Sequence, residues 1–229
     1  MVQVNQTKLF LRFRFRKQGS LQYISHLDLV RTMHKVIVRA KLPLWYTEGF
    51  NPKPKMIFAA PLSIGTESLS EFMDIRMNEY IDPAEAMARI NSNMTDEMQV
   101  IEAYYPESKF TDLKWMSYRI TINSLNLDTN AVSAANELLA SDTVEVTKKN
   151  SDMKINIRPL IKSADVKLEG GKMIVDAVLS ADPSAFLNPE YVVNALRDGC
   201  GILSSSNLMS ESYEILRQNA YFGDMTEFR

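Results

Sequence analysis

The chain has 229 residues, of which 45% are hydrophobic and 24% are charged, and its formal net charge is −2. This composition is typical of one large or two smaller folded domains and excludes disordered, collagen-like and coiled-coil proteins. No apolar run reaches the ~18–20 residues of a membrane-spanning helix, and residues 1–8 lack the apolar core of a signal peptide. We therefore expect a cytoplasmic protein with no membrane segment.

The cysteine and histidine content limits the cofactor chemistry. Cys200 is the only cysteine, so an intrachain disulfide, a cysteine-rich zinc site and a three-cysteine iron–sulfur cluster are excluded. The two histidines, His26 and His34, would lie about 12 Å apart on a shared helix, too far to ligate one metal ion. We expect no cofactor and no metal. Cys200, which stands between two glycines, is interpreted as a small buried residue rather than a nucleophile.

Charge is distributed unevenly along the chain. Residues 1–60 contain 11 Lys or Arg and two acidic residues, a net of +9, whereas residues 61–229 contain 15 basic and 26 acidic residues, a net of −11. Such polarity is typical of a surface for nucleic acid or another anionic ligand on an otherwise acidic protein. A basic surface without any ligand is the alternative.

The first half of the chain has the pattern of a β-α-β-β-α-β domain. Apolar and basic side chains alternate over residues 8–16, which predicts a half-buried strand. Ser25 as N-cap, with Asp28 three residues later, predicts a helix that continues to about Lys41. A stiff loop with two prolines follows at residues 47–55. The remaining predicted elements are strands at 56–62 and 71–77, a helix at 83–94 and a strand at 98–104.

A similar order recurs after residue 106. The predicted elements are a strand at 115–124, a helix at 128–140, strands at 144–149 and 153–157, an additional hairpin of 165–169 and 172–179, a helix from 189 to about 197 and a strand at 212–218. We therefore predict an α+β fold with two tandem ferredoxin-like (split β-α-β) domains. The first is a basic domain at residues 1–106, and the second is an acidic domain at residues 107–229 with the extra hairpin.

Several short stretches resemble a known family. They are Tyr23 to Arg31, Arg39 to Pro43, Gly49 to Pro52 and Pro61 to Gly65. In these stretches the chain resembles the radical-SAM-linked proteins, a bacterial family of unknown function that is fused to, or encoded beside, radical SAM enzymes. The resemblance is dense from about residue 9 to residue 77. That family often has histidine between the two loop prolines, where this chain has Lys53.

The resemblance implies a separate radical SAM enzyme as a partner, because this chain lacks the three cysteines of a radical SAM cluster. A looser likeness, in topology only, relates the chain to ferredoxin-like CRISPR endoribonucleases. Because fold does not imply function, that second likeness adds little to the functional interpretation.

The first candidate RNA-binding group lies on one face of the first predicted strand. Arg12, Arg14 and Arg16 follow one another at ~7 Å along that face, which is close to phosphate spacing. Phe10, on the same face, could stack a base as aromatic residues do on open RNA-binding sheets. The alternative is that this face covers the second domain, with the arginines paired to the surplus acidic residues of that domain.

The second candidate group comprises a helix face and the stiff loop. The helix presents Arg31, Lys35 and Arg39 opposite its apolar stripe, which fits phosphate binding and a solvated face equally well. The loop offers Phe50 and two cations, Lys53 and Lys55, on a backbone stiffened by its prolines. Phe50 could instead anchor the loop to the core.

His26 is the candidate for a catalytic base, because the positive end of the helix dipole favours its neutral form. A structural histidine is the alternative. The sequence favours a binding protein over an enzyme, namely an RNA-binding accessory module that acts with a separate radical SAM enzyme in RNA modification or processing. The other hypotheses are a protein–protein adaptor that docks onto that enzyme and a metal-independent endoribonuclease.

Overall fold

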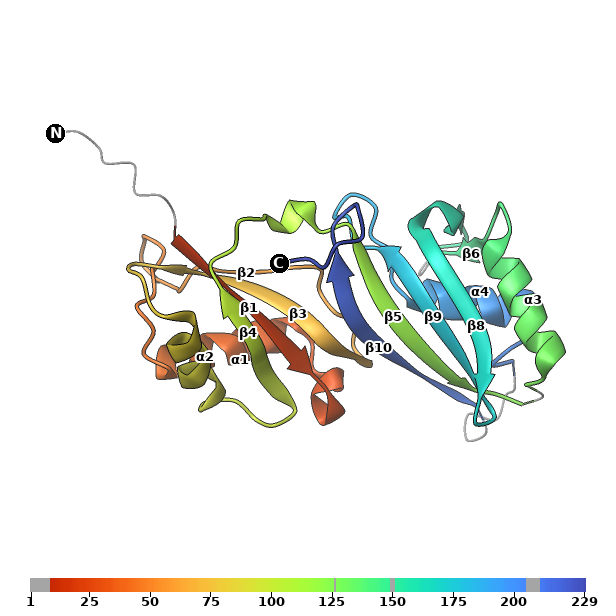
Figure 1. The fold of residues 1–229 in the computed structure, drawn as a ribbon, viewed down its shortest axis with the longest axis horizontal. Coiled ribbons are helices and arrows are strands. Elements are labelled where there is room, and N and C mark those ends of the chain that lie inside the picture. Colours follow the sequence, from red (N-terminus) through yellow and green to blue (C-terminus); the bar gives the residue numbers. More distant parts are fainter. Residues whose placement is uncertain (1–8, 126, 149–150, 205–210) are drawn as a thin grey trace. The chain divides into compact units, whose positions relative to one another are not determined.

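The computed structural model describes residues 9–125, 127–148, 151–204 and 211–229. The chain forms two compact units (Figure 1). Unit 1 ends at Phe110 and also includes Arg229, and unit 2 is Thr111–Phe228. Both units combine helices with antiparallel strands, which confirms the predicted α+β class. Lys8 and Lys149, which the predicted strands included, lie outside the described residues.

Unit 1 has the predicted order of elements. They are β1 (Leu9–Lys17), α1 (His26–Arg39), β2 (Met56–Phe58), β3 (Thr66–Met77), α2 (Pro83–Asn91) and β4 (Met98–Tyr104). Strand β1 lies between β4 and β3, and β2 pairs with β3, in each case antiparallel. The strands therefore follow the order β4-β1-β3-β2, with β1 and β3 in the centre.

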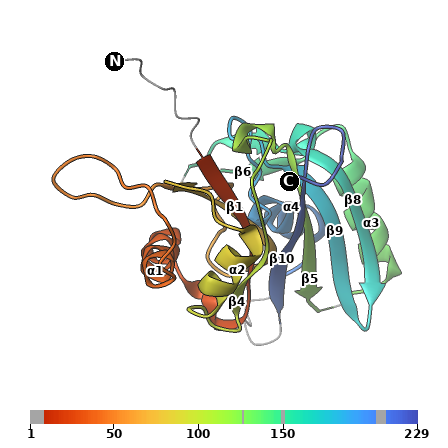
Figure 2. The ribbon, with the colours of Figure 1, turned by 60° about the vertical axis from the view of Figure 1, so that its left-hand side comes forward.

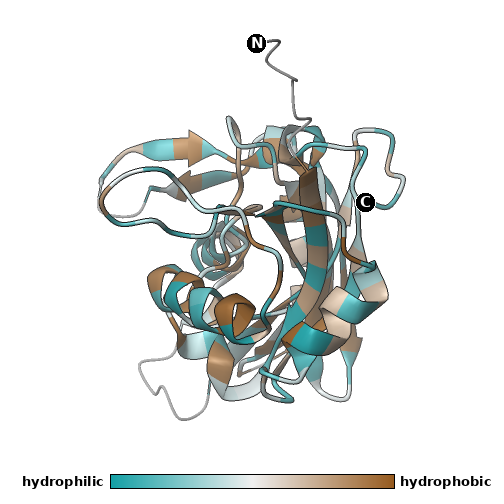
Figure 3. Cartoon of the chain, turned by 90° about the vertical axis from the view of Figure 1, so that its left-hand side faces the viewer, coloured by the Kyte–Doolittle hydropathy of each residue, from teal (hydrophilic) through white to brown (hydrophobic). Residues whose placement is uncertain are grey.

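The alternation of side chains along β1 determines which face of the sheet forms the core of unit 1. Leu11, Phe13 and Phe15 are completely buried in one cluster with apolar residues of α1 and α2. Helix α1 begins where it was predicted, because the Ser25 hydroxyl accepts a hydrogen bond of 3.1 Å from the Asp28 amide. Hydrophobic and hydrophilic bands alternate along the helices (Figure 3), as expected for elements with one face in the core.

Unit 2 also combines a sheet with two helices. Its elements are β5 (Trp115–Asn123), α3 (Thr129–Ala140), β6 (Glu145–Thr147), β7 (Lys154–Asn156), β8 (Ile161–Glu169), β9 (Lys172–Ser180), α4 (Glu190–Cys200) and β10 (Ser212–Tyr221). Within unit 2 the strand order is β10-β5-β9-β8, with antiparallel neighbours.

One prediction for unit 2 was wrong. The hairpin β8–β9, predicted as an addition, belongs to the sheet, whereas β6 and β7 form a separate two-stranded hairpin. The lengths explain this difference, because β8 and β9 each have nine residues and β6 and β7 have three each. A longer strand with one buried face stabilises a sheet more than a three-residue strand does.

An asparagine side chain is bonded to the edge strand of each unit. Asn91 of α2 accepts from the Val100 amide at 2.8 Å and donates to the Val100 carbonyl at 2.9 Å. Asn136 of α3 makes the same two bonds to Val166 of β8, at 2.9 and 2.8 Å. Unpaired backbone groups at a sheet edge can pair with another chain, and these side-chain amides bind some of those groups.

Among the described residues, no helix has the length and apolarity to span a membrane.

Candidate nucleic-acid interface

The predicted basic face of β1 is not open. Arg12 is completely buried and forms a two-pronged ion pair with Asp74, its cross-strand partner in β3, at 2.7 and 2.9 Å. The Arg12 guanidinium also lies 4.3 Å from the Phe110 ring centroid and donates to the Ser108 hydroxyl at 2.8 Å. Burial raises the pKa of Asp74, and the bonds from Arg12 offset part of this increase. The expectation that Arg12 is available to a phosphate is therefore wrong.

The other members of this strand face are half-buried. Arg14 donates to the Ser70 hydroxyl at 3.0 Å, and Arg16 donates to the Asp96 carbonyl at 3.2 Å. Phe10 is also half-buried. The anticipated alternative paired these arginines with acidic residues of the second domain. The acidic partners instead belong to unit 1, because Arg12 pairs with Asp74 and Arg14 lies 4.0 Å from Glu102 of β4.

A hairpin of residues 45–55, which we call the basic hairpin, projects from unit 1 between α1 and β2 (Figure 2). Its two arms are joined by backbone bonds from the Thr47 amide to the Lys53 carbonyl, 2.9 Å, and from the Lys55 amide to the Trp45 carbonyl, 3.2 Å. The Thr47 hydroxyl also accepts from the Lys53 amide at 3.1 Å. Arg76 of β3 stacks on the Trp45 ring, 3.9 Å from its centroid. The base of the hairpin is therefore attached to the sheet, while its tip extends beyond it.

The tip of the basic hairpin carries a fully exposed aromatic ring. The relative exposure of Phe50 is 111%, so the alternative in which Phe50 anchors the loop to the core is wrong. Lys53 and Lys55 are also exposed. Burying a phenylalanine contributes about 1.5–3 kcal/mol of favourable free energy, which this ring does not gain within the chain.

The predicted cationic face of α1 is exposed. Arg31, Lys35 and Arg39 are all exposed, as the helical periodicity predicted. Arg31 approaches Asp28 at 3.5 Å, and both side chains are more than half exposed. An exposed ion pair of this kind contributes little to stability, so Arg31 can exchange its partner for an incoming anion.

His34 lies on α1 and was not predicted as a site residue. Its pKa is lowered by burial and by the positive charge of Lys53. The positive charge of Lys53 therefore acts on the His34 ring. The helical spacing from Arg31 and Lys35 could have indicated His34, but its proximity to Lys53 depends on the path of the hairpin.

His26, the candidate catalytic residue, is exposed as the first residue of α1. Its ring lies edge-on to Phe58, with 5.5 Å between the centroids. This contact favours the structural interpretation of His26 over the catalytic one.

The described residues contain no group of three or more side chains able to hold a metal ion.

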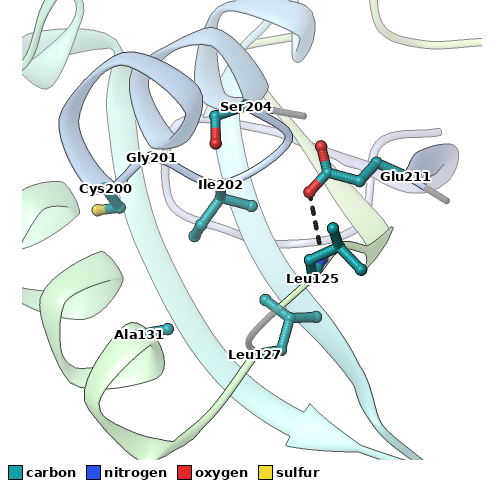
Figure 4. A pocket seen from close by; sticks show the side chains of 8 residues that line it. All are labelled: Leu125, Leu127, Ala131, Cys200, Gly201, Ile202, Ser204 and Glu211. Carbon is teal, nitrogen blue, oxygen red and sulfur yellow. Dashed lines mark hydrogen bonds between the residues drawn. The ribbon is translucent and has the colours of Figure 1, made fainter. Parts of the chain in front are cut away.

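Unit 2 has a hollow of about 200 Å³ between the end of α4 and the start of α3 (Figure 4). Cys200 and Ile202 line it, and the Glu211 carboxylate there already accepts from the Leu125 amide at 3.1 Å. Burial raises the pKa of the Cys200 thiol, so the thiol is protonated at neutral pH. Neither group is prepared for nucleophilic catalysis.

Comparisons with known proteins show likeness of fold. A chain in a crystal structure of a Cbf5-Nop10-Gar1 complex matches 95% of this chain and 50% of its own length, with 9% identity and a TM-score of 0.50. A chain in the archaeal box H/ACA sRNP Nop10-Cbf5 complex matches 90% of this chain and 46% of its own length, with 7% identity and a TM-score of 0.47. The present chain thus spans about half the length of these matched chains.

A search of curated protein sequences finds no match. A family model does match, over residues 11–189, which is more than half of the chain. The matched region contains most of the elements of both units, including α1 and the whole basic hairpin. The chain therefore belongs to the family described as "Uncharacterized protein conserved in bacteria (DUF2344)".

Proposed function

We propose that the protein is an RNA-binding accessory module that acts with a separate radical SAM enzyme in RNA modification or processing. The observation that carries the proposal is the basic hairpin, where a fully exposed phenylalanine stands beside exposed lysines. Cations for the phosphates and an aromatic face for a base are the two components that nucleic-acid surfaces combine.

The charge around the hairpin supports a polyanionic ligand. From Arg31 to Lys55 the chain carries Arg31, Lys35, Arg39, Lys41, Lys53 and Lys55 and only one acidic residue, Glu48. The side chains of these six cations are all exposed. Such a concentration of positive charge attracts phosphates, and its affinity for them decreases with salt concentration.

The proposed partner enzyme rests on the sequence resemblance described above and on the single cysteine, since any radical SAM cluster must belong to another chain. The two units support the proposed tandem ferredoxin-like arrangement. In unit 1 the first strand, β1, lies between the last strand, β4, and β3, which pairs with β2. In unit 2 the first strand, β5, lies between the last strand, β10, and β9, which pairs with β8.

A protein–protein adaptor is the second candidate. On α1, Leu27 and Val38 are 56% and 48% exposed, on the same helix face as Arg31. Exposed apolar side chains among cations could contact a protein with an acidic surface. In that case the adaptor would use α1 rather than the hairpin tip.

The two candidates are separated by a charge reversal on the hairpin. Lys53→Glu with Lys55→Glu should weaken RNA binding and lower the slope of log affinity against log salt by about 1.4, at ~0.7 per lost phosphate contact on single strands. The control is Lys154→Glu with Lys172→Glu, which makes the same charge change at exposed positions of unit 2. Circular dichroism establishes that both variants are folded.

Unchanged RNA affinity in the folded hairpin variant would overturn the RNA proposal. If the same variant instead stops co-purifying with a polypeptide that carries a radical SAM three-cysteine motif, the adaptor function is supported. RNA cleavage in EDTA that His26→Ala abolishes would instead support the endoribonuclease, since such a reaction needs no metal.

A further inference from the structure

We infer that the basic hairpin recognises unpaired nucleotides, with one base stacked on the ring of Phe50. This inference rests on the proposed function and names its substrate class, which is single-stranded RNA. It depends on the exposure of Phe50, the rigidity of the hairpin, and the position of the nearby cations.

The exposure of Phe50 leaves both faces of its ring available. Every other exposed aromatic side chain among the described residues is at most 68% exposed, compared with 111% for Phe50. Tyr80, at 68%, already stacks on Tyr105, with 5.1 Å between centroids and 21° between the planes. Phe50 lies midway between Thr47 and Lys53, which close the loop, and its full exposure lets a base approach the ring without displacing another side chain.

The hairpin holds the ring in place before any ligand arrives. Pro52 and Pro54 restrict the backbone, and an isolated bridge joins Tyr46 to Pro54 below the tip. Hydrogen bonds between Thr47 and Lys53 close the loop. A preorganised loop loses little conformational entropy on binding, so an exposed ring on it can contribute most of its stacking free energy.

The cations are within reach of the phosphates of a stacked nucleotide. Lys53 is three residues from Phe50, a span of at most about 10 Å. Bases in a duplex are stacked on each other and present no free face, whereas an unpaired base can stack on an aromatic side chain. The arrangement therefore favours a single strand over a duplex.

The test compares two RNA probes, a single strand of about ten nucleotides with one 2-aminopurine and the same strand in a duplex. We expect Phe50→Ala to lose about 5- to 150-fold affinity for the single strand, the range of a lost base–aromatic stack, and to leave the salt dependence unchanged. Phe50→Trp should restore binding and quench the 2-aminopurine fluorescence. Phe50→Leu, which is apolar but has no aromatic face, should not restore it.

Phe186→Ala, at an exposed phenylalanine of unit 2, is the matched control and should bind as the wild type does. Unchanged single-strand affinity in Phe50→Ala, an equal loss on the duplex, or full restoration by Phe50→Leu would each overturn the inference. These outcomes differ from failure of the proposed function, in which the wild-type protein binds neither probe. Because Phe50 touches no core, its three variants should keep the wild-type melting temperature.

Discussion

Arg12 illustrates how a charged residue that alternates with apolar neighbours can be part of the interior. Its side chain is completely buried, and its charge is balanced by Asp74 on the adjacent strand. A buried ion pair contributes little net stability, because both charges lose their hydration, but the loss of one partner leaves the other charge uncompensated.

We expect Arg12→Met to lower the free energy of unfolding by about 3–5 kcal/mol, because the Asp74 carboxylate is then buried alone. The double variant Arg12→Met with Asp74→Leu should recover most of this loss. Arg31→Met, at an exposed site, is the control and should change stability by no more than ~0.5 kcal/mol. Urea unfolding measures all three, and a loss below about 1 kcal/mol in Arg12→Met would contradict the role given to the pair.

His34 should make the stability of the protein sensitive to acid. Its pKa in the folded state is lowered, first by burial and then by Lys53, so the folded state binds a proton less readily than the unfolded state. The resulting stability is fully present above the unfolded pKa of ~6.5 and is lost as the pH falls through the folded pKa. Between neutral pH and a pH below ~6.5, the free energy of unfolding should therefore decrease less in His34→Gln than in the wild type.

The contribution of Lys53 can be measured separately. Lys53→Gln should raise the pKa of His34 only part of the way towards its ordinary value, because burial is the larger cause. The chain has two histidines, so proton NMR titration with His26→Gln for assignment resolves each ring. No change in the His34 titration would show that the hairpin is farther from α1 than we infer.

The turn of the basic hairpin contains a glycine in an unusual backbone conformation. Gly49 has a φ of +123°, a conformation that side-chain-bearing residues rarely adopt. The turn of the hairpin therefore depends on a residue without a side chain at this position. A Cβ at this position would meet nothing within 4 Å, so the cost of a substitution is backbone strain and not a clash.

Gly49→Ala should therefore destabilise the protein by about 1–3 kcal/mol, or distort the hairpin if the tip yields instead. Gly223→Ala is the control, because its φ lies outside the left-handed region and its nearest neighbour would be 3.9 Å from the new Cβ. Thermal unfolding, with limited proteolysis to detect an opened hairpin, distinguishes the two results. Equal melting temperatures and equal rates of proteolysis in the two alanine variants would show that the backbone strain at Gly49 is negligible.

Across the whole molecule, the charges of the two units differ in sign. Unit 1 has 15 basic and 12 acidic residues, a net of +3, and unit 2 has 11 basic and 16 acidic residues, a net of −5. An RNA ligand should therefore contact unit 1 and be repelled by most of unit 2.

The domain boundaries 1–106 and 107–229 remain a prediction. The contacts of Arg12 with Ser108 and Phe110 indicate that these two residues belong with the first domain.

Hydrogen exchange measured with and without single-stranded RNA checks this expectation. Protection should increase in residues 45–55 and along α1, while the hairpin of β8 and β9 in unit 2 should exchange at the same rate in both samples. The sample without RNA gives the baseline exchange rates. In the variant Lys53→Glu with Lys55→Glu, the RNA should no longer protect residues 45–55 and α1. Protection confined to unit 2 would place the RNA on the acidic unit and contradict the charge argument.

Local patterns in the sequence determined most of the elements. The Ser25 cap, the alternation along β1 and the glycine turn at Gly170 and Gly171 each depend on residues only a few positions apart, so they could be predicted. The exposure of the α1 cations follows from helical periodicity in the same way.

Tertiary structure alone decided whether the charged side chains are available to a ligand. Arg12 is removed from solvent by Asp74, 62 positions away, because the register of β1 against β3 places them opposite each other. The choice of β8–β9 over β6–β7 for the sheet, and the effect of the Lys53 charge on the His34 pKa, also depend on distant segments. Residue types and local spacing do not encode such registers and loop paths, because these arise from the simultaneous packing of the whole unit.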